Sequence, residues 1–344
     1  MLNYKHQETS QVVDITAWNV DQEFGDKYPE GARAKDLLIS PNQSSLPFVK
    51  PNWRYMFKYS RKDCPEQFWV EILAYRLGVK MNIDVPPAFV AFSKETSKTA
   101  SLIEWFYTAS ETLDYPFDAA RLISYFRKFG KGFKSKSKLS EIMYQGGDFC
   151  KTFIHNFDEK KGTQHNFLTI IEIMNFLEKT CDFEKAWKKH WAKTLLFDAL
   201  IGNKDRHQNN WGVIFDLNNN RARLSPVFDN GTSMAYRHQP LSFITDEDIA
   251  KYVDGRKSTH HMKWDQNDEK PAGHLTLLEK FIERYPEQKY TMSECLEQVD
   301  EGDFADILGD LEKFDVPVKL SQERAELMLK LLKYSHAKYR RALS

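Results

Sequence analysis

One change in the hydrophobic pattern constrains the fold of this chain more than any other feature. Up to about residue 107, short apolar runs alternate with Pro, Asn and Ser, which is typical of strands and turns. Beyond it, apolar residues recur every three or four positions, as in amphipathic helices. We therefore expect an α+β protein with two lobes: a strand-rich N-terminal lobe (1–107) and a helical C-terminal lobe (108–344).

The individual elements follow from the same patterns. In the N-terminal lobe, apolar runs predict strands around one helix that begins with Pro and ends with Gly. In the C-terminal lobe, helical spacing is interrupted once, by the apolar runs "WGVIF" and "ARLSPVF", which predict a hairpin joined by an Asn-rich turn. The predicted strands are 36–40, 54–60, 85–92, 100–107, 211–215 and 222–228, and the predicted helices are 65–78, 118–130, 166–180, 183–202, 275–285 and 322–343.

Composition excludes several classes of function. The chain has 344 residues, enough for two lobes. Lys and Arg (49) balance Asp and Glu (49), so we expect no direct contact with nucleic acid or with a membrane surface. The widely spaced cysteines predict reduced thiols. Because we find neither a signal peptide nor a run of about 18 apolar residues, we expect a soluble, cytoplasmic protein, with secretion as an effector left open.

Short polar side chains gather at the two ends of the predicted hairpin. Asp205 to Asn210 precede its first strand, and Asp229 follows its second. Because antiparallel pairing brings these ends together, we expect Asn210 and Asp229 to be neighbours. One carboxylate and one amide oxygen suit Mg²⁺, which takes few protein ligands and keeps water and phosphate oxygens. Asp205 would lie beside that metal as the base for an attacking hydroxyl, which is the arrangement of phosphoryl-transfer enzymes.

The motifs "DRHQNN" (205–210) and "FDNG" (228–231) resemble those of the HipA-like serine/threonine protein kinases. The resemblance implies that Asp205 is the general base and that Asn210 and Asp229 bind Mg²⁺ with ATP. The "DRH" motif is also similar to that of phosphoinositide kinases, and it implies supporting or electrostatic roles for Arg206 and His207. The likeness covers roughly residues 30 to 280 and is strongest at 199 to 234.

A charged residue in the middle of a predicted strand is the next candidate. Lys58 lies among aromatic residues in "RYMFKYS", where a charge is costly unless it is paired or bound to phosphate. This position suits the lysine that contacts nucleotide phosphates in kinases. Glu71, within the apolar stretch "FWVEILAY", is the favoured partner. Glu66 is the competing candidate, but its position in the first helical turn is already explained by the helix dipole.

Two further parts of the nucleotide site are expected from the kinase layout. A loop before Lys58 should cover the phosphates. The segment "ISPNQSSLPFVKPN" (39–52) has no glycine, and HipA-like kinases also lack the usual Gly-rich loop. In some of these kinases a serine of the loop is autophosphorylated, and Ser44 and Ser45 are the matching candidates. The adenine-binding hinge should lie where the lobes meet, at Glu104, Trp105 and Phe106.

The resemblance implies an ATP-dependent protein kinase and leaves its biological role open. Some family members are toxins that phosphorylate translation factors such as aminoacyl-tRNA synthetases and are bound by a small antitoxin. A secreted effector kinase would have the same sequence features. Two other functions remain as alternatives: a phosphoinositide-like lipid kinase, and a nucleotide-binding pseudokinase that acts as an interaction module.

Overall fold

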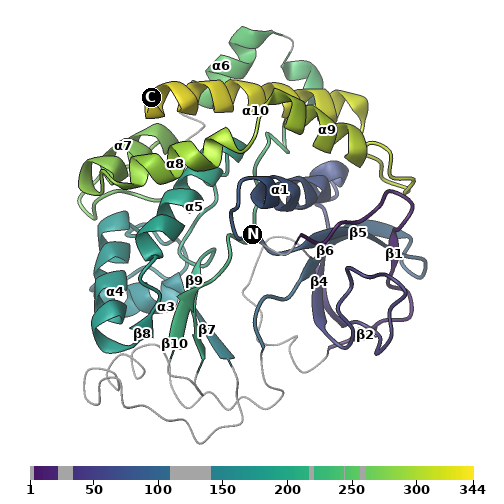
Figure 1. The fold of residues 1–344 in the computed structure, drawn as a ribbon, viewed down its shortest axis with the longest axis horizontal. Helices are drawn as coiled ribbons and strands as arrows, with labels where there is room; N and C mark the ends of the chain where they lie inside the picture. Colours follow the sequence, from purple (N-terminus) through teal and green to yellow (C-terminus); the bar gives the residue numbers. More distant parts are fainter. Residues whose placement is uncertain (1–3, 22–33, 109–140, 217–220, 244, 256–260) are drawn as a thin grey trace, which may run out of the picture.

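The computed structural model describes residues 4–21, 34–108, 141–216, 221–243, 245–255 and 261–344. Within these ranges a sheet-rich N-terminal part is followed by a mostly helical part, and the two lie side by side (Figure 1). The predicted α+β fold is therefore confirmed. The predicted division between residues 107 and 108 stays a prediction. None of the described helices is both long enough and apolar enough to cross a membrane.

The first sheet contains the strands predicted from the N-terminal apolar runs. Among the described residues its strand order is β1-β5-β6-β4-β3-β2, and β4 pairs antiparallel with β3 and with β6. Lys58, the last residue of β4, lies opposite Lys35 on one side and Ser101 on the other. The strands are β1 (Val13–Asp14), β2 (Asn19–Val20), β3 (Lys35–Ile39), β4 (Arg54–Lys58), β5 (Ala88–Ser93) and β6 (Lys98–Glu104).

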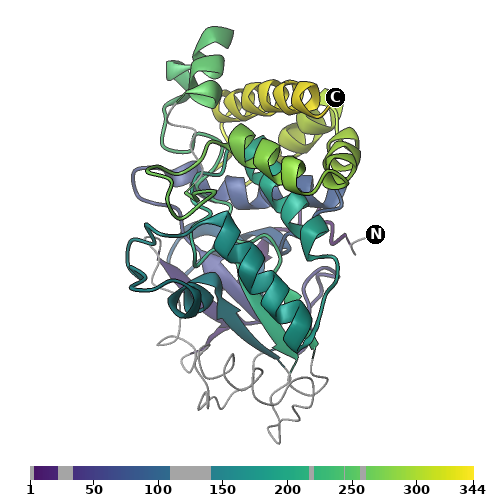
Figure 2. The ribbon, with the colours of Figure 1, turned by 90° about the vertical axis from the view of Figure 1, so that its left-hand side faces the viewer.

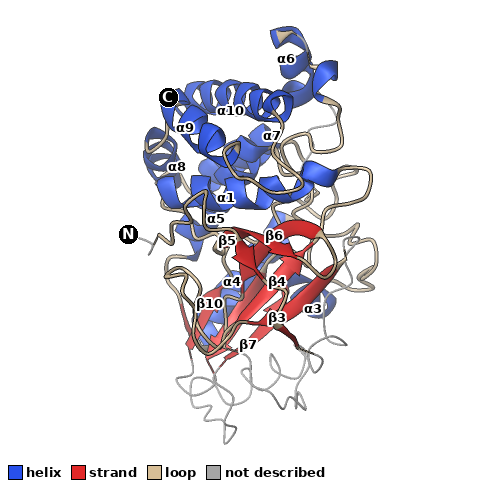
Figure 3. Ribbon diagram, turned by 90° about the vertical axis from the view of Figure 1, so that its right-hand side faces the viewer, coloured by secondary structure: helices blue, strands red, loops and turns tan. Residues whose placement is uncertain are grey.

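Helix α1 (Phe68–Lys80) lies between this sheet and the C-terminal helices, as Figure 1 and Figure 3 both show. A short 3-10 turn, η2 (Pro65–Gln67), leads into it. Every residue from Phe68 to Gly78 is buried, including the charged Glu71. A helix that is apolar on all sides needs cover on all sides, and two separate parts of the chain provide it here.

The C-terminal cover of α1 comes from residues 303 to 324. The Trp69 ring lies 5.9 Å from the ring of Phe314, and its indole N–H donates to a backbone carbonyl at residue 318 over 3.3 Å. Near the other end of α1, Arg76 forms an ion pair with Asp310. The helix is thus fastened to segments more than 200 residues later in the sequence.

The second sheet has the order β7-β9-β10-β8 among the described residues, and β9 and β10 form the predicted hairpin. The second hairpin strand is shorter than predicted. It ends at Leu224 because Pro226 has no N–H to donate and the N–H of Val227 turns to the carbonyl of Asp84, at 2.7 Å. The strands are β7 (Glu141–Gln145), β8 (Asp182–Phe183), β9 (Gly212–Asp216) and β10 (Arg221–Leu224).

The helices predicted at 166–180, 183–202, 275–285 and 322–343 are present, whereas the one at 118–130 lies outside the described residues. Helix α5 ends at Gly202, whose positive φ of 66° suits glycine. Helix α6 lies at the edge of the molecule beside α10 (Figure 2). The helices of this part are α3 (Gly146–Phe153), α4 (Phe167–Thr180), α5 (Trp187–Ile201), α6 (Asp246–Asp254), α7 (His274–Arg284), α8 (Gln288–Glu297), α9 (Glu301–Leu311) and α10 (Gln322–Leu343).

Candidate active site

A cleft between the first sheet and the helical part contains most of the predicted site residues. Its empty space, including the part open to solvent, is about 1190 Å³, somewhat above the roughly 300–1,000 Å³ of typical small-molecule sites. Strand β4, helix α1, the end of β6 and the loops on either side of the hairpin all line it. The predicted residues that do so are Lys58, Glu71, Glu104, Trp105, Phe106, Asp205, His207, Asn210 and Asp229.

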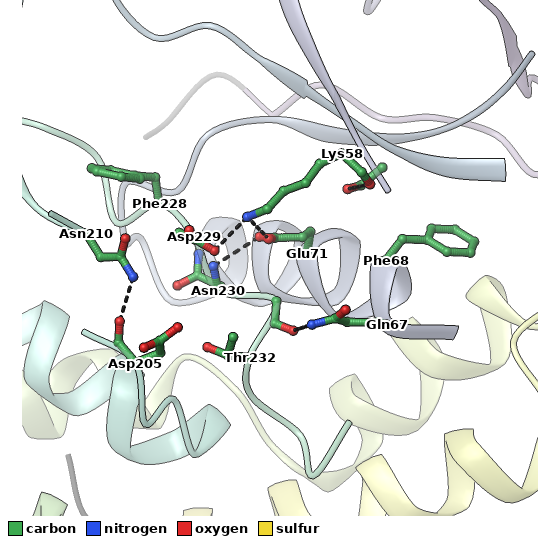
Figure 4. A network of polar contacts seen from close by, with 12 residues as sticks. Lys58, Gln67, Phe68, Glu71, Asp205, Asn210, Phe228, Asp229, Asn230 and Thr232 are labelled. Carbon is green, nitrogen blue, oxygen red and sulfur yellow. Dashed lines mark hydrogen bonds and ion pairs between the residues drawn. The ribbon is translucent and has the colours of Figure 1, made fainter. Parts of the chain in front are cut away.

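Lys58 is held at one end of the cleft by two carboxylates. Its side chain is buried, with the residue only 5% exposed. Its Nζ donates to Glu71 over 2.7 Å and to Asp229 over 2.6 Å (Figure 4). These partners offset the cost of burying the ammonium group. Of the two candidate partners, Glu71 therefore contacts Lys58, and Glu66 contacts residues of α10 instead.

Asp229 has a backbone conformation that residues other than glycine rarely adopt. Its φ is 56°, in the left-handed region, and such backbone is found preferentially at functional sites. The side chain is 34% exposed, so it faces the cleft while it contacts Lys58. The next N–H, that of Asn230, donates to the second oxygen of Glu71 over 3.1 Å. Glu71 thus holds both Lys58 and the backbone that carries Asp229.

Asp205 and Asn210 are positioned by the loop that follows α5. The backbone N–H of Asp205 donates to the side chain of Asn203 over 3.0 Å. The Asn210 amide nitrogen donates to the carbonyl of Asp205 over 2.6 Å. This hydrogen bond orients the amide, since the nitrogen faces the loop and the oxygen points the other way. The oxygen of Asn210 therefore points away from this contact, and its role as a Mg²⁺ ligand stays a prediction.

Arg206 connects the two ends of the hairpin through a buried set of hydrogen bonds. The guanidinium is fully buried and makes two hydrogen bonds to Asp198, at 3.0 and 2.8 Å. It also donates to the carbonyls of Asn210, over 2.8 Å, and Phe228, over 2.5 Å, and to the side chain of Asn230, over 2.9 Å. Burial is the largest single influence and lowers the pKa of Arg206, but the carboxylates of Asp198, Asp229 and Asp205 together outweigh it and the pKa is raised. Through Arg206 the two hairpin ends meet, as the sequence predicts.

His207 is packed into the same loop. Its Nδ1 accepts a hydrogen bond from the backbone N–H of Asn209 over 3.1 Å, which places the proton of the neutral ring on Nε2. Burial is the main cause that lowers its pKa, although Asp205 and Asp229 act in the opposite direction. The neutral ring is therefore favoured, and a supporting role for His207 stays a prediction.

The predicted hinge closes the opposite end of the cleft. The Glu104 carboxylate accepts hydrogen bonds from Lys5, at 2.5 Å, and from the hydroxyl of Tyr55, at 3.1 Å. The Glu104 side chain is thus engaged by protein groups, and recognition of adenine through the backbone at this end stays a prediction. The Phe106 ring stacks on Phe228, with centroids 5.4 Å apart, so hinge and hairpin form a continuous apolar surface.

The predicted phosphate loop needs a correction, because the segment with Ser44 and Ser45 lies away from the cleft. Ser44 and Ser45 do not line the cleft, and Ser44 bonds locally to the N–H of Leu46 over 3.1 Å. The segment 40–53 joins β4 at Arg54, four residues and about 13 Å along the strand from Lys58. It lies at the far end because β2 precedes β3, so the strand at 36–40 is not the first of the sheet. Residues 22–33, which join β2 to β3, lie outside the described ones. Phosphorylation of either serine stays a prediction.

Several residues that hold the site were missed by sequence reasoning. Asp198 and Asn203 hold the loop before the hairpin, and Asn230 holds the segment after it. The amide of Gln67 donates to the carbonyl of Gly231 over 2.8 Å. Asp198 did carry a signal, because it is a charge within the apolar run "LLFDALIG", just as Glu71 is within "FWVEILAY".

The donors at the lysine end of the cleft fit a hard cation. One carboxylate and one oriented amide oxygen, from Asp229 and Asn210, are the ligand types that Mg²⁺ takes while it keeps water and phosphate oxygens. Within the described ranges there is no group of three or more His, Cys, Asp or Glu side chains that could hold a metal by themselves. A site here would therefore depend on phosphate oxygens for part of its ligand shell.

A sheet-rich part and a helical part with a lysine–glutamate pair in the cleft between them define a protein-kinase-like fold. The family model described as the HipA-like C-terminal domain matches residues 29–302, and the chain belongs to this family of HipA-like kinases. No curated protein matches the sequence.

Two solved structures match the chain, and the first of them is similar to it in fold. One is the proinflammatory kinase CtkA of Helicobacter pylori, with a TM-score of 0.66 and 15% identity over 96% of each chain. The other is HipA of Shewanella oneidensis MR-1, from its complex with HipB and operator DNA. That match has a TM-score of 0.48 and 12% identity, and it covers 93% of this chain and 66% of the other. At such identities the likeness concerns the fold alone.

Proposed function

We propose that this protein is an ATP-dependent serine/threonine protein kinase that uses Mg²⁺. The observation that carries the proposal is the convergence of Lys58, Glu71 and Asp229 at the end of the cleft that Asp205 and Asn210 also line. A charge-paired lysine, two oxygen ligands and a carboxylate are the parts that phosphoryl transfer requires.

In this proposal each residue has a separate role. Lys58 contacts the nucleotide phosphates, and Glu71 keeps its side chain in the cleft. Asn210 and Asp229 hold Mg²⁺, which when bound neutralises phosphate charge. Asp205 accepts or orients the proton of the protein hydroxyl, so that positioning and charge neutralisation supply most of the rate.

Other residues support these groups. Glu104, Trp105 and Phe106 form the adenine hinge through their backbone. Arg206 holds the loops that carry the metal ligands, and His207 fills the space beside Asp205 as a neutral ring. We include autophosphorylation in the proposal, with the serine left undefined.

The partners belong to the same proposal. The similar structures are described as a proinflammatory kinase and as a HipA toxin in complex with HipB. We propose a protein as the substrate, with a translation factor such as an aminoacyl-tRNA synthetase and an antitoxin protein as the candidates to test first. Pull-down from the native organism and phosphoproteomics after induced expression would identify both.

The direct test is phosphate transfer from labelled ATP, to the protein itself and to extract proteins. Asp205→Asn, which removes the proposed base, should lower transfer by about 10²–10⁴-fold, the range for a catalytic acid–base group. Asp229→Asn, which removes the charged ligand of the proposed Mg²⁺ site, should also lower transfer. Asn is the better replacement for Asp229, because it tolerates the left-handed backbone. Asp182→Asn, an exposed carboxylate of β8, is the matched control and should transfer at the wild-type rate.

Three outcomes would contradict the proposal. Nucleotide binding without any transfer indicates a pseudokinase. Transfer to phosphoinositide vesicles but not to protein indicates the lipid kinase. Full transfer in the presence of excess EDTA would remove the metal from the mechanism.

A further inference from the structure

The segment that follows Asp229 ends in a tight turn, Ala235–His238. The N–H of His238 donates to the carbonyl of Ala235 over 2.8 Å, so Tyr236 and Arg237 are the two central residues. Both line the cleft. Met234 and Ala235 have φ values of 55° and 49° although neither is glycine. Two consecutive residues in this conformation are costly, and such backbone persists where surrounding contacts impose it.

Arg324 of α10 supplies those contacts. It is only 7% exposed, and its guanidinium donates to the carbonyl of Ala235 over 3.3 Å and to that of His238 over 2.9 Å. These are the first and last carbonyls of the turn. One planar side chain with a fixed fork of donors therefore defines both ends of the turn.

The same guanidinium reaches the start of α1. Its Nε donates to one oxygen of Glu66 over 3.4 Å, and the other oxygen of Glu66 accepts the backbone N–H of Ser321 over 2.9 Å. Glu66 belongs to η2, which leads into the helix that carries Glu71. Arg324 thus joins the turn, the beginning of α1 and the beginning of α10. It lies beyond residues 29–302, the part of the chain that the family model matches.

The turn lies at the lysine end of the cleft rather than at the hinge. The segment that ends in the turn begins at Asp229, which contacts Lys58, and it is bound to η2 where the amide of Gln67 donates to the carbonyl of Gly231. Arg324 then connects the turn itself to Glu66 in the same η2.

The turn also adjoins the loop that carries Asp205. The ring of His238 lies 5.1 Å from that of Tyr252 in α6. On the same Tyr252 ring, 4.1 Å from its centroid, lies the ammonium group of Lys204, the residue before Asp205. A hydroxyl that approaches Asp205 from solvent meets this side of the cleft, whereas a bound adenine would lie at the other end.

We infer that the Ala235–His238 turn recognises the segment of the protein substrate that carries the acceptor hydroxyl, and that Arg324 is the positioning residue that holds this turn. The inference rests on the proposed kinase function and defines its substrate side. Arg237 is exposed at the cleft, so the acceptor segment it favours has an acidic side chain near the hydroxyl.

The test compares acceptor and nucleotide kinetics. An oriented library of Ser/Thr peptides is offered to the wild-type protein with Mg-ATP, and the best peptide is used to measure KM for both substrates. The wild type should select Asp or Glu beside the acceptor. Arg237→Ala should lose this selection and raise the peptide KM by about fivefold or more, the effect of one lost charge-assisted contact, with the ATP KM unchanged.

Arg324→Gln should raise the peptide KM in the same way, and Arg324→Lys should not restore it, because an ammonium cannot serve both carbonyls in one plane. Lys333→Ala is the control, because Lys333 lies on α10 like Arg324 and the change removes only an exposed ion pair with Glu301 of α9. A merely structural role for Arg324 would lower the melting temperature and the active fraction but leave both KM values unchanged. Arg237→Ala changes an exposed side chain, so it tests the turn even if the Arg324 variants fold poorly.

The outcomes separate the two proposals. A wild type that transfers no phosphate to protein or peptide overturns the proposed function, and this inference with it. A wild type that transfers phosphate but shows no acidic selection overturns only the inference. So does an Arg237→Ala variant with an unchanged peptide KM, or one in which the ATP KM rises instead, which would assign Arg237 to the nucleotide phosphates.

Discussion

Replacement of Asp198 by Asn should destabilise this protein far more than its nearly identical shape suggests. The carboxylate has no exposure to solvent. It accepts two hydrogen bonds from Arg206, at 3.0 and 2.8 Å, and one from Asn203, at 3.0 Å. An Asn side chain fills the same space, but it carries no charge and turns an N–H₂ group toward one of these donors.

The loss of stability in Asp198→Asn can be estimated from the unpaired charge that the change leaves behind. Arg206 would stay buried without the carboxylate beside it, and breaking a buried ion pair in this way costs about 3–5 kcal/mol. This is a large part of the roughly 5–15 kcal/mol by which a domain is stable. Because Arg206 also holds the carbonyls of Asn210 and Phe228, phosphate transfer should fall in the protein that remains folded.

Urea denaturation monitored by tryptophan fluorescence measures the effect. Asp182→Asn is the control, since its ion pair with Arg221 is 3.4 Å long and both side chains are mostly exposed. Such pairs contribute at most about 1 kcal/mol. A difference of less than about 1 kcal/mol between the two variants would refute the assignment of Arg206 and Asp198 as a buried pair on which the site depends.

Two further predictions concern stability. Burial, followed by Arg206 and Lys193, lowers the pKa of His190 to about 4. Between about pH 4 and 6.5, His190 is protonated in the unfolded chain but neutral in the folded one. The free energy of unfolding should therefore fall as the pH decreases from about 6.5 toward 4. The urea midpoint should fall less steeply with decreasing pH, between pH 7 and 4.5, in His190→Gln than in the wild type. Equal pH dependence in the two proteins would exclude His190 as the cause. Gly202→Ala should lower the melting temperature, because the left-handed backbone with a φ of 66° costs an alanine about 1 kcal/mol. Gly309 lies in the interior of α9, where a methyl group added by Gly309→Ala would meet no neighbouring atom within 4 Å, so this change should raise the melting temperature by the equivalent of about 0.5–1 kcal/mol. If the two variants shifted the melting temperature in the same direction, the argument would be contradicted.

The parts of the site that could be predicted are those in which a local pattern has one physical explanation. A charge inside an apolar strand or helix must find a partner, and this reasoning paired Lys58 with Glu71, as the 2.7 Å contact confirms. Antiparallel geometry likewise placed the hairpin ends together. The same argument applied to Asp198 would have found the partner of Arg206, because a buried aspartate on helix α5 needs a cation as much as Lys58 needs an anion.

The parts that could not be predicted depend on order in space. Strand β2 has two residues, too few for any alternation pattern, yet it precedes β3 in the sheet, so that the segment with Ser44 and Ser45 joins β4 at the end away from Lys58. Arg324 and Glu66 are separated by 258 residues, and nothing local to either indicates that they meet. Strand β7 and helix α3 were missed for a related reason, since both are short and gain their stability from packing against the hairpin.

The packing of α1 has a consequence for synthesis on the ribosome. Chains emerge from the N-terminus, and domains generally fold in that order. The helix that carries Glu71 is sealed by Asp310, Phe314 and the start of α10, which are translated more than 200 residues after it. A nascent chain that already contains Lys58, Asp205 and Asp229 therefore still lacks the layer that fixes Glu71. The proposed kinase would therefore become competent only after residues 310–321 have left the ribosomal tunnel.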